Sequence, residues 1–220
     1  RDTDRSRGLG DVYKRQIMQL TNSLVTICCN NVLSVTGGDL YISVMTIVSS
    51  IRQIIDTPIH AITEGSSPVI SYNYGARRPK RVFQSWLTMS VMAILYTLLA
   101  WGVILFAPRF LIGIFSSDQA LITDAIPALK LYFGAFVFQA LQYVGQTMFK
   151  SLGKKKFAIF FSLLRKVIIV VPLTYILPYL FHMGSDGVFL AEPVSNVLGG
   201  SACFLSLIHI SEPTRPISIS

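Results

Sequence analysis

The chain has 220 residues, of which 52% are hydrophobic and only 14% are charged, and its mean hydropathy is +0.56. This composition argues against a water-soluble domain with an ordinary charged surface and indicates a membrane protein. The net charge is +8, and the three cysteines give no disulfide framework, because Cys28 and Cys29 are adjacent in one apolar stretch.

The two ends of the chain differ from the rest of it. Residues 1–16, RDTDRSRGLGDVYKRQ, are charged, lack the apolar stretch of a signal peptide and change abruptly to apolar sequence at Ile17. They resemble a translated adapter or vector segment, and residues 206–220, SLIHISEPTRPISIS, resemble its counterpart. We therefore expect residues 1–16 and 206–220 to be non-native segments that flank a natural fragment at 17–205; the alternative is a natural disordered tail at each end.

Between these ends lie six apolar stretches, each long enough to cross a membrane as a helix. A hydrocarbon core of about 30 Å requires about 20 predominantly apolar helical residues. The stretches are continuous rather than alternating in polarity, which favours helices over a barrel. The predicted fold class is an all-α polytopic membrane protein with six transmembrane helices, near residues 17–36, 41–71, 83–107, 121–150, 157–180 and 187–206.

Many of the basic residues gather in two short loops. One loop, between the second and third stretches, contains Arg77, Arg78, Lys80 and Arg81, and the other contains the lysines of residues 150–156. Both loops fall on the same side of a six-span topology, and the positive-inside rule predicts that this side is cytoplasmic. No aromatic residues of the kind that bind single strands are interleaved with these charges, so membrane topology explains them better than a nucleic-acid partner does.

The second stretch carries four ionisable residues at intervals of four, namely Arg52, Asp56, His60 and Glu64. On a regular helix they form one polar stripe, which is costly in lipid and therefore predicts contact with protein or with a water-filled cavity. Asp56 and Glu64 are candidate carriers of protons or sodium ions, and His60 could relay a proton. The alternative for Arg52 and Asp56 is an ion pair that only holds helices together, so Glu64, with no basic residue one turn away, is the preferred candidate.

The fourth stretch has a polar but uncharged face, which includes Gln139, Gln142 and Tyr143. These side chains could hydrogen-bond a substrate in a cavity, or they could bind two helices to each other.

The fifth and sixth stretches contain charges of opposite sign. Arg165 and Lys166 lie about ten residues inside the fifth stretch, and Glu192 and Asn196 lie on the sixth. We expect Arg165 or Lys166 to pair with Glu192 as a structural ion pair between helices, and Arg52 to belong to a structural ion pair with Asp56 in the alternative given above.

The sequence offers little support for an enzyme. It contains no metal-ligand spacing, no phosphate-binding glycine loop and no combination of a nucleophile with a base. We therefore expect a protein that is not an enzyme, holds no metal and needs no cofactor other than a coupling ion.

Several segments resemble the MATE family of multidrug and toxic-compound exporters. In order and spacing they are similar to helices seven to twelve of that family, and the similarity covers nearly all of residues 17–205. The segments are NNVLSVTGGD (30–39), TEGSSPVISYNYGARRPKRV (63–82), APRFLIGIFSS (107–117), FKSLGK (149–154), SLLRK (162–166) and GVFLAEP (187–193).

The resemblance implies a fold of twelve helices in two six-helix lobes, of which this chain would be the carboxy-terminal one. It also implies that entry of a proton or sodium ion drives rocking between outward and inward states. Some members have carboxylates on the seventh and tenth helices, whereas the matching segments here read Leu20-Thr21-Asn22 and 139–142, without carboxylates. The coupling site could therefore be Asp56 or Glu64, or it could lie on the missing first lobe.

We accordingly expect a fragment of a cation-coupled antiporter that exports organic or cationic compounds across the inner membrane. Its expected partners are a small organic substrate, the lipid bilayer and the missing amino-terminal lobe, with no nucleic acid. The alternatives are a flippase for lipid-linked oligosaccharides from the same superfamily, which would need a more basic cavity, and a membrane subunit that does not transport.

Overall fold

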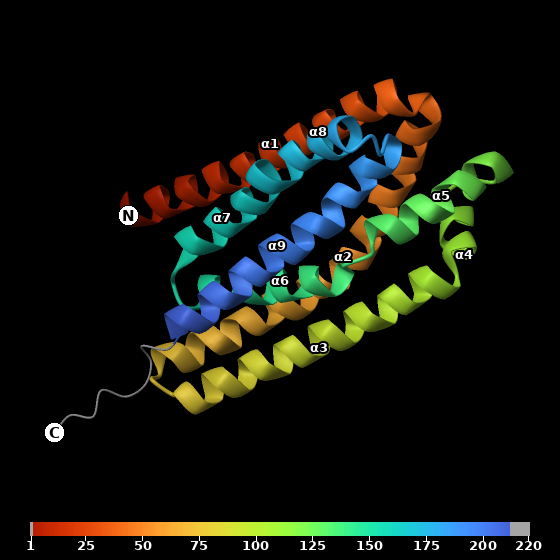
Figure 1. The fold of residues 1–220 in the computed structure, drawn as a ribbon. Helices are drawn as coiled ribbons and strands as arrows, with labels where there is room; N and C mark the ends of the chain where they lie inside the picture. Colours follow the sequence, from red (N-terminus) through yellow and green to blue (C-terminus); the bar gives the residue numbers. More distant parts are fainter. Residues whose placement is uncertain (1, 212–220) are drawn as a thin grey trace.

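The computed structural model describes the backbone of residues 2–211 and the side chains of residues 16, 19–154 and 156–207. This part of the chain folds into helices joined by short turns, with no strand among the described residues. Most of the helices run along one common long direction and form an elongated bundle (Figure 1).

The first half of the chain forms four helices, α1 (Asp2–Thr36), α2 (Gly38–Gly75), α3 (Pro79–Phe106) and the short α4 (Pro108–Gly113). The turn from α1 to α2 depends on glycine. Gly38 has a φ of +69°, a value that favours glycine, and a Cβ atom on Gly37 would lie 2.4 Å from the Ser185 hydroxyl oxygen. The two glycines therefore let α1 and α2 meet close to the start of the last helix.

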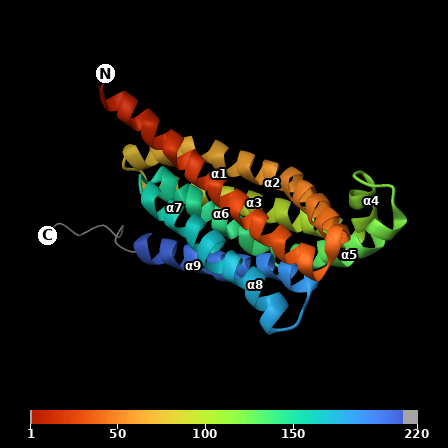
Figure 2. The same cartoon turned by 90° about the horizontal axis from the view of Figure 1, so that it is seen from above.

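The second half forms α5 (Gln119–Tyr132), α6 (Phe136–Ser151), α7 (Lys155–Leu163), the π-helical segment η1 (Leu164–Val170), α8 (Val171–Leu180) and α9 (Ser185–Ser211). The stretch predicted as one helix over 121–150 is thus two helices, bent by 50° across residues 133–135. The stretch predicted over 157–180 is continuous, but η1 interrupts its α-helical hydrogen bonding. Seen from above (Figure 2), α4 and the beginning of α5 lie at the end of the bundle opposite the beginning of α1.

Three helical segments among the described residues are long and apolar enough to cross a membrane, namely Pro79–Phe106, Lys156–Tyr179 and Ser185–Leu207. The bent pair α5 and α6 provides a fourth crossing if it is counted as one span. The structure therefore supports an all-helical protein with three or four candidate spans. The first two predicted crossings, 17–36 and 41–71, do not meet the same criterion of length and composition.

Two hydrophobic clusters hold the bundle together. One lies among α1, α2, α5, the start of α9 and the ends of α3 and α4, and the other lies among α3, α6, α7 and the ends of α2 and α9. Many large apolar side chains remain on the outer surface, such as Leu95, Leu99 and Phe106, which is 91% exposed. An outer surface of this kind suits a lipid environment.

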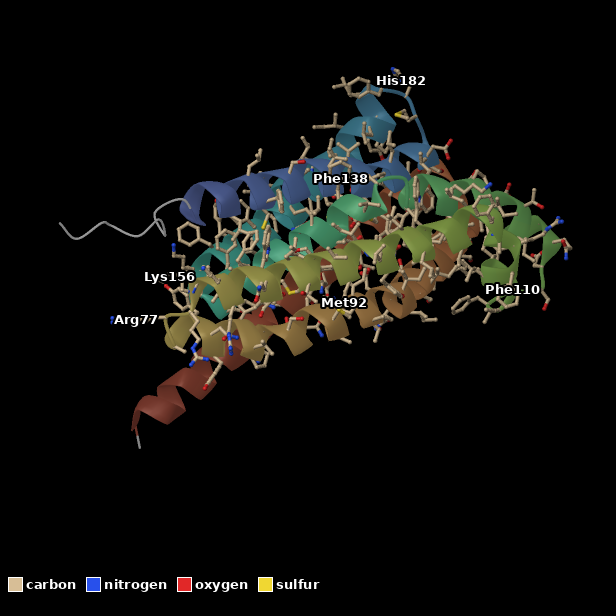
Figure 3. The ribbon with its side chains drawn as sticks, turned by 90° about the horizontal axis from the view of Figure 1, so that it is seen from below. Arg77, Met92, Phe110, Phe138, Lys156 and His182 are labelled. Atoms are coloured by element: carbon tan, nitrogen blue, oxygen red, sulfur yellow. The ribbon has the colours of Figure 1, made fainter. Side chains whose placement is uncertain are left out.

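The two basic loops lie at the same end of the bundle. Figure 3 places Arg77 and Lys156 close to this end, and it places Phe110 at the opposite end. Arg77 has a φ of 54° in the turn between α2 and α3, where its backbone N–H donates to the Tyr74 carbonyl oxygen over 3.0 Å.

Candidate functional site

A cavity of about 560 Å³ opens among α1, α2, α5, α6, η1 and α9. Its volume falls within the range of about 300–1,000 Å³ that is typical of small-molecule sites. Its wall contains apolar residues and many polar and ionisable ones, whereas the outer surface of the bundle is largely apolar. The ionisable and aromatic lining residues are Cys29, Arg52, Asp56, His60, Tyr132, Tyr143, Arg165, Lys166 and Glu192.

Glu192 of α9 is the centre of the charge network in this wall. Its Oε1 atom lies 2.6 Å from Arg52 Nη1 of α2 and 2.9 Å from Arg165 Nη1 of η1. Arg165 also donates to Asn196 Oδ1, one turn further along α9. Buried charges are stable only when they are paired and hydrogen-bonded, so this carboxylate joins three helical segments.

Asp56 forms a second group on the same wall. Its Oδ2 atom lies 3.3 Å from Arg52 Nε, and it accepts hydrogen bonds from Gln139 Nε2 at 3.1 Å and from the Tyr143 hydroxyl at 3.2 Å. Gln139 and Tyr143 both belong to α6, so Asp56 joins α2 to α6. Its neighbours are donors rather than the oxygen ligands that a hard metal cation prefers.

Aromatic rings complete the wall. The Tyr132 hydroxyl accepts a hydrogen bond from Arg52 Nη1 at 2.5 Å, and Arg52 Cζ lies 5.5 Å from the centroid of the Tyr132 ring. The rings of His60 and Tyr143 lie 4.5 Å apart between centroids. The cavity thus offers aromatic surfaces next to charged groups, which allows it to hold an amphipathic molecule.

The π-helical segment η1 presents two cations to the cavity in succession. Arg165 is buried, whereas Lys166 is half-buried and donates to Asn22 Oδ1 of α1. π-helical turns are rare and occur frequently at functional sites.

Six of the residues that were predicted to form the site or its ion pairs line this cavity. Gln139 does not line it, but its amide supports the Asp56 carboxylate from behind. Gln142 is buried outside the lining, and its Oε1 atom has no hydrogen-bond partner among the described residues. The six lining residues are Arg52, Asp56, His60, Tyr143, Arg165 and Glu192.

Glu64 lies outside the cavity lining. Its side chain is 54% exposed, and its Oε1 atom lies 2.6 Å from Nζ of Lys150, on the last turn of α6. The polar stripe on α2 therefore divides, with Arg52, Asp56 and His60 at the cavity and Glu64 in an exposed ion pair. The basic partner of Glu64 comes from another helix, which the spacing of residues along α2 does not reveal.

Several polar lining residues were not among the predicted site residues, and Asn22, Tyr132 and Lys166 are the ones that contact or extend the charge network. A lysine inside an apolar stretch is itself a signal of function, so Lys166 could have been chosen on that ground. Tyr132 and Asn22 carry no charge, and only the packing of α5 and α1 against α2 brings them to the site.

No group of three or more His, Cys, Asp and Glu side chains in the described part of the chain is placed to hold a metal ion. Apolar helices that enclose a charged cavity define the class of protein. It is an integral membrane protein with the architecture of a small-molecule transporter.

The chain belongs to the MatE family, whose pattern it matches over residues 16–176. Members of this family are transporters, not enzymes. Among curated proteins, the chain is 24% identical over 160 residues to the FAD transporter of Shewanella oneidensis, a match that covers 71% of this chain and 34% of that protein.

Solved structures show the same fold. A multidrug resistance MATE transporter in an inward-facing conformation has a TM-score of 0.85 at 22% identity, covering 94% of this chain and 48% of that one. A MATE protein in complex with MaL6 has a TM-score of 0.83 at 19% identity, with coverages of 90% and 45%. A MOP superfamily transporter from Pyrococcus furiosus, described as having a binding pocket of reversed polarity, has a TM-score of 0.81 at 22% identity, with coverages of 90% and 44%. The chain thus spans between a third and a half of the length of these proteins.

Proposed function

We propose that this chain is one six-helix lobe of a secondary transporter that exports small organic compounds by alternating access, in exchange for protons or sodium ions. The observation that carries the proposal is the set of paired charges in the wall of the cavity. Charged groups at membrane depth are costly, and in transporters they mark the path of a substrate or ion. We further propose that the protein resides in the inner membrane and that its two basic loops face the cytoplasm.

The proposal of a single lobe rests on the proportion of the related structures that the chain covers. The solved MATE structures are about twice as long as the matched segment, which covers 44–48% of their chains. Transporters of this kind place their substrate site where two halves meet. A second lobe would close the open side of the cavity.

The ion pairs supply a means of changing conformation. Asp56 pairs with Arg52 within α2 and binds α2 to α6 through the hydrogen bonds from Gln139 and Tyr143, whereas Arg52 binds α2 to α9 through Glu192. A proton that arrived at Asp56 would remove the charge that attracts Arg52 and would weaken the contact between α2 and α6. An ion that binds one arrangement better than another shifts the population toward it. Asp56 is the coupling residue that we propose for this lobe, and groups on the facing lobe are the alternative.

A flippase for lipid-linked oligosaccharides is the second candidate. It was expected to need a more basic cavity, and the lining has three basic side chains, Arg52, Arg165 and Lys166, against two carboxylates. The related FAD transporter also handles, by its name, a phosphate-containing molecule. A membrane subunit without transport activity is the third candidate, and absence of flux through the full-length protein would favour it.

Flux through the full-length protein tests the proposal. The protein is reconstituted into vesicles, a pH or sodium gradient is imposed, and movement of cationic rhodamine 6G and of anionic riboflavin 5′-phosphate is measured. We expect gradient-driven movement of at least one compound with the full-length protein and none with the 220-residue chain alone, which supplies only one wall of the cavity. Absence of flux for both compounds under both gradients would contradict the proposal, and flux with this chain alone would contradict the assignment of a single lobe.

A further inference from the structure

The charges that line the cavity do not balance. Arg52, Arg165 and Lys166 are cationic, whereas Asp56 and Glu192 are the acidic groups of the lining. With His60 neutral, the described wall therefore has an excess of one positive charge, and protonation of His60 would increase it.

The excess charge can be assigned to one residue. Both carboxylates are held by guanidinium groups, with Arg52 contacting Asp56 at 3.3 Å and Glu192 at 2.6 Å, and with Arg165 contacting Glu192 at 2.9 Å. Lys166 carries the excess charge, since no described carboxylate lies within ion-pair distance of its ammonium group. Its hydrogen bond goes instead to the neutral amide oxygen of Asn22.

We propose that the cavity binds an organic anion with an aromatic part, and that Lys166 contacts the negatively charged group of this cargo. An ammonium group with a neutral partner, in the wall of a cavity of about 560 Å³, gains more from an incoming anion than a paired guanidinium does. The rings of Tyr132, Tyr143 and His60 supply a surface for an aromatic part. This inference rests on the proposed function and narrows its substrate class.

A cationic cargo suits the same wall less well. It would have to share a carboxylate that one or two guanidinium groups already contact, and it would lie against a described wall whose excess positive charge repels it. The expectation of cationic substrates came from the family resemblance and the carboxylates on α2, and it did not include the cations that η1 adds to the cavity.

An anionic cargo also changes how coupling has to work. A cation would compete directly with a proton for Asp56, whereas an anion bound at Lys166 does not require that carboxylate. Exchange then requires that the cargo and the coupling ion prefer different conformations of the protein.

Two flavins that differ in one phosphate test the inference. Riboflavin 5′-phosphate and riboflavin share the ring and the sugar alcohol chain, so the difference between their affinities reports the anionic group. Both are dialysed to equilibrium against the purified full-length protein in detergent micelles. We expect the phosphate form to bind about tenfold more tightly, the magnitude of a hydrogen-bonded ion contact, and we expect salt to weaken only this form.

Variants assign this preference to Lys166. Lys166→Gln should lower the affinity for riboflavin 5′-phosphate about tenfold and leave the affinity for riboflavin unchanged. Lys166→Arg should retain the preference for the phosphate form. The matched control is Lys130→Gln on α5, because Lys130 is exposed and lies outside the cavity lining. Should Lys166→Gln fail to fold, Lys166→Met is the second neutral variant, with the same expected loss, and the two flavins on the unaltered protein still decide whether the cavity prefers the anion.

Several outcomes would overturn the inference. These are no binding of riboflavin 5′-phosphate, equal binding of the two flavins, or full affinity in a folded Lys166→Gln variant. Flux of rhodamine 6G by the full-length protein, together with no flavin binding, would overturn the proposal of an anionic cargo and leave the proposed function intact. Flavin binding that depends on Lys166 but is accompanied by no flux would contradict the proposed function and not the anion site.

Discussion

Glu192 shows how one residue can fix the positions of two others. Its Oε1 atom contacts a guanidinium group on α2 and another on η1, and the exposed fraction of its side chain is only 10%. Removal of the shared carboxylate would leave two like charges facing each other in a buried setting, where neither can recover full hydration.

We therefore expect Glu192→Gln to lower the free energy of unfolding by about 3 kcal/mol or more, the usual cost of breaking a buried ion pair. The measurement is thermal unfolding of the purified chain in detergent. The matched control is Glu64→Gln, in which the lost pair with Lys150 is exposed, so a change of less than about 1 kcal/mol is expected. Equal shifts in the two variants would show that the buried network does not stabilise the bundle.

The contact between α6 and α9 depends on a residue with no side chain. A Cβ atom added to Gly200 would lie 2.4 Å from the carbonyl oxygen of Phe138, and a backbone atom cannot move aside as the tip of a side chain can. Small residues at helix contacts allow this kind of close approach in membrane proteins.

Gly200→Ala should destabilise the bundle by about 1–3 kcal/mol, because the two helices have to separate. Gly102→Ala on α3 is the control, since a Cβ atom there meets nothing within 4 Å and alanine favours the helix. The melting temperature of each variant in detergent checks the expectation. A Gly200→Ala variant that melts at the temperature of the unaltered chain would show that this contact is not tight.

The sequence predicts helices better than it predicts their interruptions. Long apolar runs identified most of the helical stretches, because hydropathy over about 20 residues is a strong signal. The 50° bend between α5 and α6 and the π-helical segment η1 were not predicted. Pro127 lies inside α5, whereas the bend lies at 133–135, so a search for proline would have placed it in the wrong turn.

The candidate site was predictable from the sequence mainly where its residues lie on one helix. Arg52, Asp56 and His60 share one face of one helix, which spacing reveals. The proximity of Glu192 to Arg52 and of Lys150 to Glu64 arises from the packing of different helices, and residue spacing does not encode it.

At the scale of the whole molecule, the two basic loops should face the same aqueous compartment. Single cysteines at Arg77 and Lys156, in a chain whose Cys28, Cys29 and Cys203 are replaced, should react with a membrane-impermeant thiol reagent from the same side. A cysteine at Phe110 should react only from the opposite side, because this residue lies at the other end of the bundle (Figure 3). Labelling of positions 77 and 156 from opposite sides would contradict the proposed topology.

The central claim is that the charged cavity, and not the exposed pair of Glu64 with Lys150, couples an ion to transport. Gradient-driven flux in vesicles should be compared for the full-length protein, its Asp56→Asn variant and its Glu64→Gln variant, with the more rapidly transported of rhodamine 6G and riboflavin 5′-phosphate as cargo. We expect Asp56→Asn to reduce flux at least about tenfold, because the amide cannot exchange a proton or hold Arg52 by charge, and Glu64→Gln to retain most of it. Full flux in Asp56→Asn, or equal losses in the two variants, would contradict the account.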